Sequence, residues 1–265
     1  MDGFEETFQI YVISLDSKDR RENVKKQFSQ IGLRFEFIDG VLAKNINLQD
    51  VYDEEANRTW YYCEKYNYRS GLTYGEIGCA LAHRKVYEKM INGNIPFAFI
   101  FEDDLVFEAK AAEVINGLAK AKFVNAVVKI DIQCSFPKNL GKILEINSEY
   151  SVCATISPIS LTLGYYVDLI AAKNLYKLTE KIFVVADDWH YFRCFVLVYA
   201  LNKPAVRPNE NFKSLIEEDR ANVVPKKVRN KIKFKRFVKK FIPFGVLELY
   251  SKIRSKRLQK SNVGE

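Results

Sequence analysis

Three consecutive carboxylates at the end of an apolar segment are the first candidates for chemistry. The segment Phe97–Phe101 is almost purely apolar, and Glu102-Asp103-Asp104 follows it directly. Neighbouring carboxylates repel one another, so a nearby cation would stabilise the cluster. Carboxylate oxygens suit Mg²⁺ or Mn²⁺, and such a metal commonly bridges the phosphates of a nucleotide. The cluster therefore predicts a divalent-metal site, with a solvated acidic turn as the alternative.

The two histidines of the chain each stand near carboxylates in the sequence. Glu76 and His83 are seven residues apart, so they share one helix face with Cys79 and Ala80. Polar groups on a face of small residues indicate a cleft, and a buried Glu–His pair that orders the packing is the alternative. His190 follows an acidic pair and is a candidate third metal ligand, because imidazole also suits Mn²⁺; a partly exposed structural histidine is the alternative.

A β-α-β pattern opens the chain and can position these groups. The apolar run Phe8–Leu15 predicts a strand buried on both faces, Arg20–Ile31 carries apolar residues at helical spacing, and Gly32 ends that helix. Phe35–Ile38 then predicts the next strand. This order indicates a mostly parallel sheet whose ligand crevice lies at the carboxyl ends of the strands.

The later elements alternate in the same way. After a polar, Tyr-rich excursion through 57–70, the pattern predicts helices over 75–92 and 171–178 and from Asp188, and strands over 97–101 and near 126–130, 152–156, 165–167 and 196–201. The expected fold class is therefore α/β.

Composition excludes several classes of protein. The chain has 265 residues, 48% of them hydrophobic, which is enough for one catalytic-sized domain with an appendage. Its five cysteines are scattered and never spaced C-x-x-C, so neither a disulfide framework nor a thiolate zinc cage is indicated. The acidic start and the lack of a long apolar stretch favour a cytoplasmic protein. Kinase, P-loop and dinucleotide-binding motifs do not occur.

The basic charge is concentrated at the end of the chain. Residues 220–265 hold 15 Lys and Arg against two Glu, a balance of +13, whereas residues 1–219 balance to −5. Apolar residues recur there at helical spacing and Pro243-Phe244-Gly245 interrupts them, which predicts two short basic amphipathic helices. Such helices lie on anionic membranes. Packing on the domain is the alternative, and nucleic acid is disfavoured because no reading module accompanies the charge.

Four motifs together resemble glycosyltransferase family 25, which contains bacterial lipooligosaccharide β-galactosyltransferases and collagen galactosyltransferases. They are, in the family's order, Tyr11–Leu15 followed by Arg20-Arg21, Leu72–His83, Phe99–Asp104 and Ala186–Trp189. The resemblance spans roughly residues 8–208. It implies a GT-A-like fold, a nucleotide-sugar donor and an inverting transfer. Ala82, where members usually carry Ser, departs from the pattern and affects only a local hydrogen bond.

The resemblance also implies roles for the acidic cluster. Glu102-Asp103-Asp104 stands where GT-A enzymes place their D-x-D, with Glu102 and Asp104 as metal ligands and Asp103 facing the ribose or the sugar. The metal is then Mn²⁺ or Mg²⁺.

Further residues are implied on the donor side. Ile13, Ser14 and Leu15 lie where the uracil and ribose would rest, and Arg20 or Arg21 would approach a phosphate, with a solvated pair at a helix start as the alternative. Glu76 and His83 are assigned to the same cleft.

An inverting displacement requires a base that takes the proton of the acceptor hydroxyl, and a carboxylate apart from the metal suits this task. Asp187 and Asp188 are the candidates, with Asp187 as helix cap and Asp188 as base. The alternative is an ordinary N-cap followed by a first-turn acid. Trp189 beside them would stack on a sugar or fill the core.

The sequence therefore predicts a GT-A-like catalytic domain over 1–219 and a basic amphipathic tail over 220–265. The expected activity is metal-dependent, inverting transfer of galactose from UDP-galactose to a lipooligosaccharide or lipopolysaccharide acceptor, by a cytoplasmic enzyme at the inner face of the cytoplasmic membrane. Three alternatives stay open: a glucosyltransferase of the same family, a non-catalytic membrane- or nucleic-acid-binding protein, and a metal-dependent phosphohydrolase or nucleotidyltransferase, which two histidines disfavour.

Overall fold

The computed structural model describes residues 8–63, 71–131, 139–155, 159–213 and 216. The contacts divide the chain into two compact units, 1–220 and 221–265, and all described residues belong to the first. The predicted tail helices lie outside the described residues. None of the helices in the described segments is long and apolar enough to cross a membrane.

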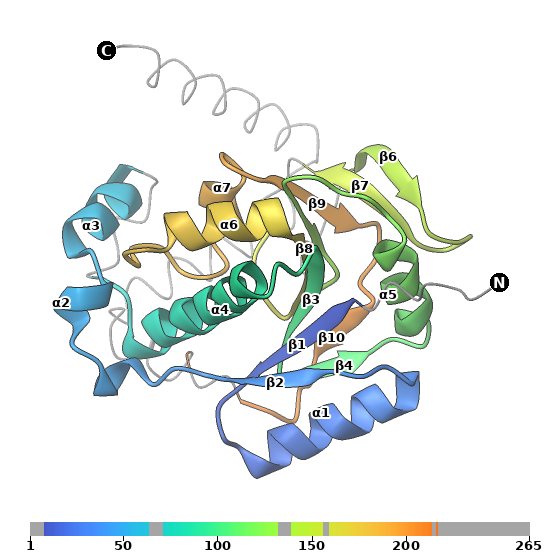
Figure 1. The fold of residues 1–265 in the computed structure, drawn as a ribbon, viewed down its shortest axis with the longest axis horizontal. Helices are drawn as coiled ribbons and strands as arrows, with labels where there is room; N and C mark the ends of the chain where they lie inside the picture. The colour runs from blue at the N-terminus through green and yellow to red at the C-terminus, as the bar shows by residue number, and fades with distance from the viewer. Residues whose placement is uncertain (1–7, 64–70, 132–138, 156–158, 214–215, 217–265) are drawn as a thin grey trace, which may run out of the picture. The chain divides into compact units, whose positions relative to one another are not determined.

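An eight-stranded mixed sheet forms the centre of the domain (Figure 1). Its strand order is β2-β1-β3-β8-β5-β9-β7-β6. The strands are β1 Gln9–Ser14, β2 Glu36–Asp39, β3 Phe97–Glu102, β5 Ala126–Lys129, β6 Asn139–Glu145, β7 Ser151–Thr155, β8 Gly164–Asp168 and β9 Leu197–Leu201. A separate antiparallel pair joins β4 Leu105–Phe107 to β10 Val206–Pro208.

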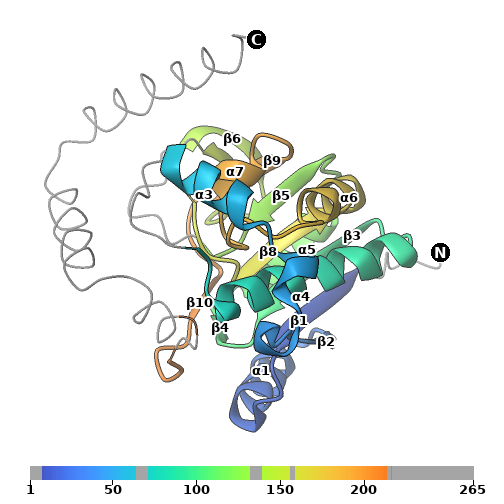
Figure 2. The same cartoon turned by 90° about the vertical axis from the view of Figure 1, so that its left-hand side faces the viewer.

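Helices cover both faces of this sheet. They are α1 Lys18–Ile31, α2 Leu48–Val51, α3 Glu54–Cys63, α4 Tyr74–Asn92, α5 Ala111–Ala119, α6 Leu169–Leu178 and α7 Trp189–Phe192, together with a 3-10 turn, η1, at Ala43–Asn45. Side chains alternate along each strand, so Ile10 and Val12 of β1 pack with α1 and α5, while Tyr11 and Ile13 pack with α4, α6 and α7. Figures 1 and 2 show α4 and α6 side by side on the second face.

Most predicted elements are confirmed, and the sheet is more mixed than expected. The pairs β1–β2, β1–β3 and β5–β9 are parallel, as predicted from the β-α-β start. The pairs β3–β8, β5–β8, β7–β9 and β6–β7 are antiparallel. Three helices were not predicted: α5, the short α2, and α3, whose residues fall partly in the polar, Tyr-rich stretch.

Local signals explain where the site-bearing helices begin and end. Gly32 adopts φ 68°, a left-handed conformation that glycine accepts without strain, and it ends α1. At the start of α4, the Thr73 side chain accepts from the Glu76 N–H, and the Glu76 carboxylate accepts from the Thr73 N–H at 2.9 Å. This reciprocal pair is a capping box, which fixes the first turn of α4.

Gly78 allows α4 to approach the segment before η1. A Cβ at this position would lie 2.2 Å from the Val41 carbonyl oxygen, which belongs to backbone and cannot swing away. Gly78→Ala is therefore expected to lower the free energy of unfolding by about 1–3 kcal/mol, the usual cost of overpacking. Gly93→Ala, at the other end of α4, meets its nearest atoms at 3.2 Å and should cost less than about 1 kcal/mol. Urea unfolding of both variants measures the difference, and equal losses would contradict the close contact.

Candidate active site

The acidic cluster lies at the carboxyl ends of the two neighbouring strands β1 and β3, where Ile13 is in register with Glu102. Asp103 is buried there, at 6% exposure. Its Oδ2 accepts from the Ser14 hydroxyl at 2.7 Å, and its Oδ1 accepts from Arg20 Nη1 at 2.6 Å. Both carboxylate oxygens are thus bound within the protein. Asp103 joins the end of β1 to α1, and its contact with ribose or sugar stays a prediction.

Arg20 is held firmly over this cluster. Its Nη2 donates to the Lys213 carbonyl at 2.8 Å, its Nη1 lies 3.8 Å from Asp104 Oδ2, and its guanidinium lies over the Phe212 ring. Arg21 instead pairs with Asp39 at 2.6 Å on the exposed side of α1. Of the two predicted arginines, Arg20 is therefore the one at the acidic cluster.

Asp104 carries an unsatisfied oxygen. Its Oδ1 is buried and has no hydrogen-bond partner among the described residues. Burial and the charges of Glu102 and Asp103 raise the pKa of Asp104 to about 7, against the opposing effect of Arg20. A buried carboxylate oxygen that repels its neighbours and lacks a donor is the kind of group that a cation stabilises. The buried, unpaired Oδ1 is therefore consistent with the predicted role of Asp104 as a metal ligand.

Glu102 is held by a network that favours its charged form. Thr162 Oγ1 donates to Glu102 Oε1, and His83 Nε2 lies 3.4 Å from the same oxygen. Burial disfavours the charge, yet the contacts with His83 and Thr162 and the charge of Lys129 outweigh burial, so the pKa of Glu102 lies below its usual value. His83 Nδ1 is 2.8 Å from the Tyr165 hydroxyl, so the buried histidine pairs with Glu102 and not with Glu76.

Two further predicted site residues lie in helices. Glu76 is 1% exposed and belongs to the capping box of α4. His190 lies in α7, with its ring 6.4 Å from that of Trp60. Within the described part of the chain, the ligand atoms of Cys79, His83 and Glu102 lie within 4.8 Å of one another; this group includes the predicted metal ligand Glu102 but neither Asp104 nor His190.

The second acidic pair stands at the start of α7. Asp188 is the N-cap, because its Oδ1 accepts from the Tyr191 N–H at 3.2 Å, and its Oδ2 accepts from Trp60 Nε1 at 2.9 Å. The predicted cap, Asp187, instead accepts from the Leu161 N–H at 3.1 Å. The capping role was therefore assigned one residue too early. Burial raises the pKa of Asp188 despite its hydrogen bonds with Trp60 and Tyr191.

Leu161 connects the two acidic groups. It has φ 72°, which is rare for a residue with a side chain. Its N–H binds Asp187, its carbonyl accepts from Lys129 Nζ at 2.6 Å and from Trp189 Nε1 at 2.8 Å, and the next residue, Thr162, donates to Glu102. Trp189 is 1% exposed and fills the core, so of its two predicted roles the structure supports this one.

Lys129 was missed by the sequence analysis. It is fully buried in β5, lies 2.8 Å from Asp131 Oδ1 and stands 5.0 Å from the Trp189 ring. A lysine inside the apolar run Ala126–Ile130 was the available signal, since buried charges in strands are rare unless they are paired. Lys129 thus stabilises the Leu161 backbone by donating a hydrogen bond to its carbonyl oxygen.

Lys129→Met is expected to destabilise the protein by about 3–5 kcal/mol, because it leaves Asp131 buried and unpaired. The double variant Lys129→Met, Asp131→Asn should recover most of that loss, since it removes the stranded charge and keeps an acceptor for the Gly164 N–H. Urea unfolding measures the free energy of unfolding of the single and the double variant, and hence the loss and its recovery. If the double variant is as unstable as the single one, the pairing does not account for the loss.

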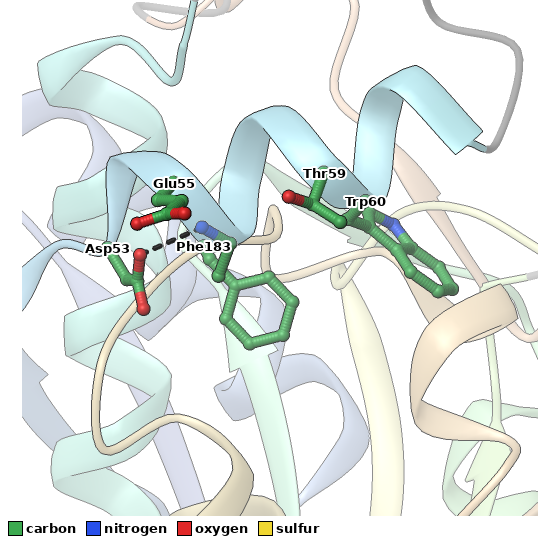
Figure 3. A pocket seen from close by; sticks show the side chains of 6 residues that line it. Asp53, Glu55, Thr59, Trp60 and Phe183 are labelled. Atoms are coloured by element: carbon green, nitrogen blue, oxygen red, sulfur yellow. Dashed lines mark hydrogen bonds between the residues drawn. The ribbon is translucent and has the colours of Figure 1, made fainter. Parts of the chain in front are cut away.

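An open pocket lies along α3 (Figure 3). Its volume is about 520 Å³, and its lining is Asp53, Glu55, Ala56, Thr59, Trp60 and Phe183. Five of these six residues belong to α3 or directly precede it. Asp53 Oδ1 accepts from the Ala56 N–H at 2.8 Å, and Trp60 connects the pocket to Asp188. Figure 2 shows α3 beside α7, where the rings of Trp60 and Tyr191 lie 5.0 Å apart.

Comparison with known proteins identifies the family. Residues 7–190 match the family model described as glycosyltransferase family 25 (LPS biosynthesis protein). The chain belongs to glycosyltransferase family 25. The family 25 resemblance seen in the four motifs is thereby confirmed, and a role as a glycosyltransferase is supported.

Relatives fall into animal and bacterial groups. Procollagen galactosyltransferase 1-A of Xenopus laevis is 31% identical over 177 residues, 63% of this chain and 28% of the relative. A Haemophilus influenzae protein named as a glycosyltransferase is 24% identical over 258 residues, 88% of each chain. Lipooligosaccharide biosynthesis protein lic2B of Haemophilus influenzae is 27% identical over 174 residues, 62% of this chain and 61% of the relative. The chain spans less than a third of the length of the insect and frog relatives it matches.

Proposed function

We propose that this family 25 member is a metal-dependent, inverting hexosyltransferase that transfers galactose from UDP-galactose to a lipooligosaccharide acceptor. The observation that carries the proposal is the division of the site into two acidic groups. Asp104 offers a buried oxygen without a donor, and Asp188 stands apart from it as a carboxylate with a raised pKa. The donor and the acceptor would therefore each be served by a different carboxylate.

The donor nucleotide is proposed to lie at the ends of β1 and β3. Ile13, Ser14 and Leu15 were predicted to contact the uracil and ribose. The side chains of Ile13 and Ser14 are buried, whereas Leu15 is half-buried and its side chain can contact a ligand directly. Ser14 acts through Asp103, and Arg20 brings a positive charge beside Asp104. This guanidinium favours a diphosphate near the cluster.

Asp104 and Glu102 are the residues that would hold Mn²⁺ or Mg²⁺, and His190 is retained only as a weaker candidate. When bound, the metal would supply positive charge that neutralises the leaving diphosphate. Thr162 and His83 orient Glu102 for this task, and Lys129 holds the backbone that carries Thr162.

Asp188 is proposed as the base that accepts the proton of the attacking hydroxyl. Burial raises its pKa, which makes the carboxylate a better proton acceptor than an exposed aspartate. The N–H groups of Trp60 and Tyr191 fix its orientation. Asp187 is the second choice: its Oδ2 accepts from the Leu161 N–H, so it binds the segment that carries Thr162, whereas Asp188 is bound by Trp60, which lines the open pocket.

The names of relatives support the finer assignments. A procollagen galactosyltransferase among them favours galactose, and a lipooligosaccharide biosynthesis protein favours a lipooligosaccharide acceptor. A glucosyltransferase of the same family is the second candidate.

The basic tail supports a place at the inner face of an anionic membrane, where a lipid-linked acceptor would be. Truncation after residue 219 should then abolish binding to anionic vesicles and slow transfer to a lipid-embedded acceptor, while the rate on a soluble acceptor is kept. Equal losses on both acceptors would contradict the membrane role.

A panel of UDP-sugars tests the reaction itself. The full chain with Mn²⁺ should release UDP from UDP-galactose faster than from UDP-glucose or UDP-N-acetylglucosamine, and a chelator should stop the release. Release that is unchanged in chelator would contradict metal dependence. Faster release from UDP-glucose would favour the glucosyltransferase, and no release from any donor would contradict the transferase proposal.

A further inference from the structure

The pocket beside Asp188 presents two kinds of surface to a ligand. Trp60 and Phe183 supply aromatic rings, and Asp53 and Glu55 supply carboxylates (Figure 3). Trp60 is half-buried and Glu55 is exposed, so both remain accessible. The set of lining residues contains no lysine, arginine or histidine.

This combination matches the chemistry of a saccharide. The C–H face of a pyranose packs on an aromatic ring, and its hydroxyl groups donate to carboxylate oxygens. Aromatic side chains with a few polar groups are typical of small-molecule sites. The carboxylates also select among saccharides, because a phosphate or a uronic acid would be repelled. The chemistry therefore favours a neutral sugar.

The position of the pocket gives this sugar a role. Trp60 lines the pocket and also donates to Asp188 Oδ2 at 2.9 Å. On the other side of the acidic pair, Asp187 binds Leu161, and the neighbouring Thr162 binds Glu102. A series of contacts therefore leads from the pocket to the acidic pair Asp187-Asp188, from there to Leu161-Thr162, and finally to Glu102. The pocket and Glu102 therefore stand at the two ends of this series of contacts, with the acidic pair between them.

We propose that this pocket is the acceptor-binding site and that it takes a neutral sugar residue whose attacking hydroxyl reaches Asp188. The inference rests on the proposed function and deepens it by naming the chemical class of the acceptor. Glu55 and Asp53 bind hydroxyl groups of the acceptor sugar, and Trp60 both stacks on its ring and orients Asp188. Anionic acceptors are repelled by the same carboxylates.

A matched pair of charge reversals on α3 tests the site. Glu55 lines the pocket, whereas its neighbour Glu54 does not and makes only an exposed contact with Arg58 at 3.9 Å. Both residues lie in the first turn of α3, so replacement by lysine has the same effect on the helix itself. Glu55→Lys and Glu54→Lys therefore differ mainly in what they present to the pocket.

Trp60 provides a binding signal that does not depend on turnover. The chain has two tryptophans, and Trp189 is 1% exposed, so a ligand in the pocket should alter the fluorescence of Trp60. The probes are lactose and methyl β-glucoside as neutral sugars, and glucuronic acid and glucose 6-phosphate as charged ones, each titrated into the full chain with UDP and Mn²⁺. The signal should disappear in Trp60→Phe, which assigns it to this indole.

The expected result is a saturable change with a neutral probe and none with the charged probes over the same range. Glu55→Lys should weaken neutral binding at least about tenfold, as expected for loss of a hydrogen bond to a charged group, and Glu54→Lys should change it less than twofold. UDP release from UDP-galactose without acceptor should stay within about twofold in Glu54→Lys.

Three outcomes would overturn the inference: no neutral probe alters Trp60 fluorescence, the charged probes bind equally well, or the two lysine variants behave alike. Failure of the proposed function is a separate result, because it would appear as no UDP release from any UDP-sugar by the unmodified chain.

Discussion

Asp104→Ala should abolish sugar transfer while the fold stays intact. The variant loses the buried Oδ1 that has no donor among the described residues, and with it the ligand proposed to hold the metal at the leaving diphosphate. We expect turnover to fall by at least about 10³-fold, at or beyond the upper range for removing one electrostatic contact to a developing charge. Initial rates with UDP-galactose and Mn²⁺ measure this loss.

Stability separates loss of chemistry from loss of structure in this variant. Because its neighbours repel the charged form of Asp104, the variant should be at least as stable as the parent at neutral pH. Glu108→Gln, on the exposed side of the same region and paired with Arg207, is the matched control and should keep full activity. Normal turnover by Asp104→Ala would show that the metal, if any, is held elsewhere.

Asp188→Asn should lower turnover by about 10²–10⁴ while the affinity for the donor is unchanged, because the proton acceptor is lost and the cluster at the ends of β1 and β3 is untouched. The amide oxygen of asparagine can still accept from the Tyr191 N–H, which keeps the cap of α7, whereas the hydrogen bond from Trp60 is lost. The dissociation constant of UDP and the turnover number, measured separately, give the two effects.

The neighbouring variant Asp187→Asn provides the comparison. Its hydrogen bond with the Leu161 N–H can be kept by the amide oxygen, so its turnover should fall less. If Asp188→Asn instead loses UDP affinity with turnover unimpaired at saturation, Asp188 is a binding residue and the base lies elsewhere.

Local signals predicted the elements whose ends are set by neighbouring residues. Gly32 ends α1 and the acidic cluster stands at the end of β3, as expected, whereas the capping box of Thr73 and Glu76 that begins α4 was not predicted. The helix α3 was missed because its tyrosines and charged residues give no clear apolar stripe. The N-cap of α7 was assigned to Asp187 instead of Asp188 because an N-cap is fixed by backbone geometry, which the residue types alone leave open by one position.

The contacts between distant segments could not be predicted. Trp60 meets Asp188 across 128 positions, and Lys129 meets Leu161 across 32. Both depend on which strands are neighbours and on how the helices cover them, and a single sequence does not reveal strand order. The pocket was missed for the same reason, because Phe183 joins α3 only in the folded chain.

The strand order has a consequence for how the protein is made. Strand β8 lies between β3 and β5, although both are synthesised before it. Until Gly164–Asp168 leaves the ribosome, β3 and β5 each have an unpaired edge, and such edges invite pairing with other chains. Thr162, which orients Glu102, arrives with the same segment. The nascent chain is therefore both inactive and prone to aggregation until β8, and after it β9 between β5 and β7, have been inserted into the sheet, and chaperone protection would matter most during that interval.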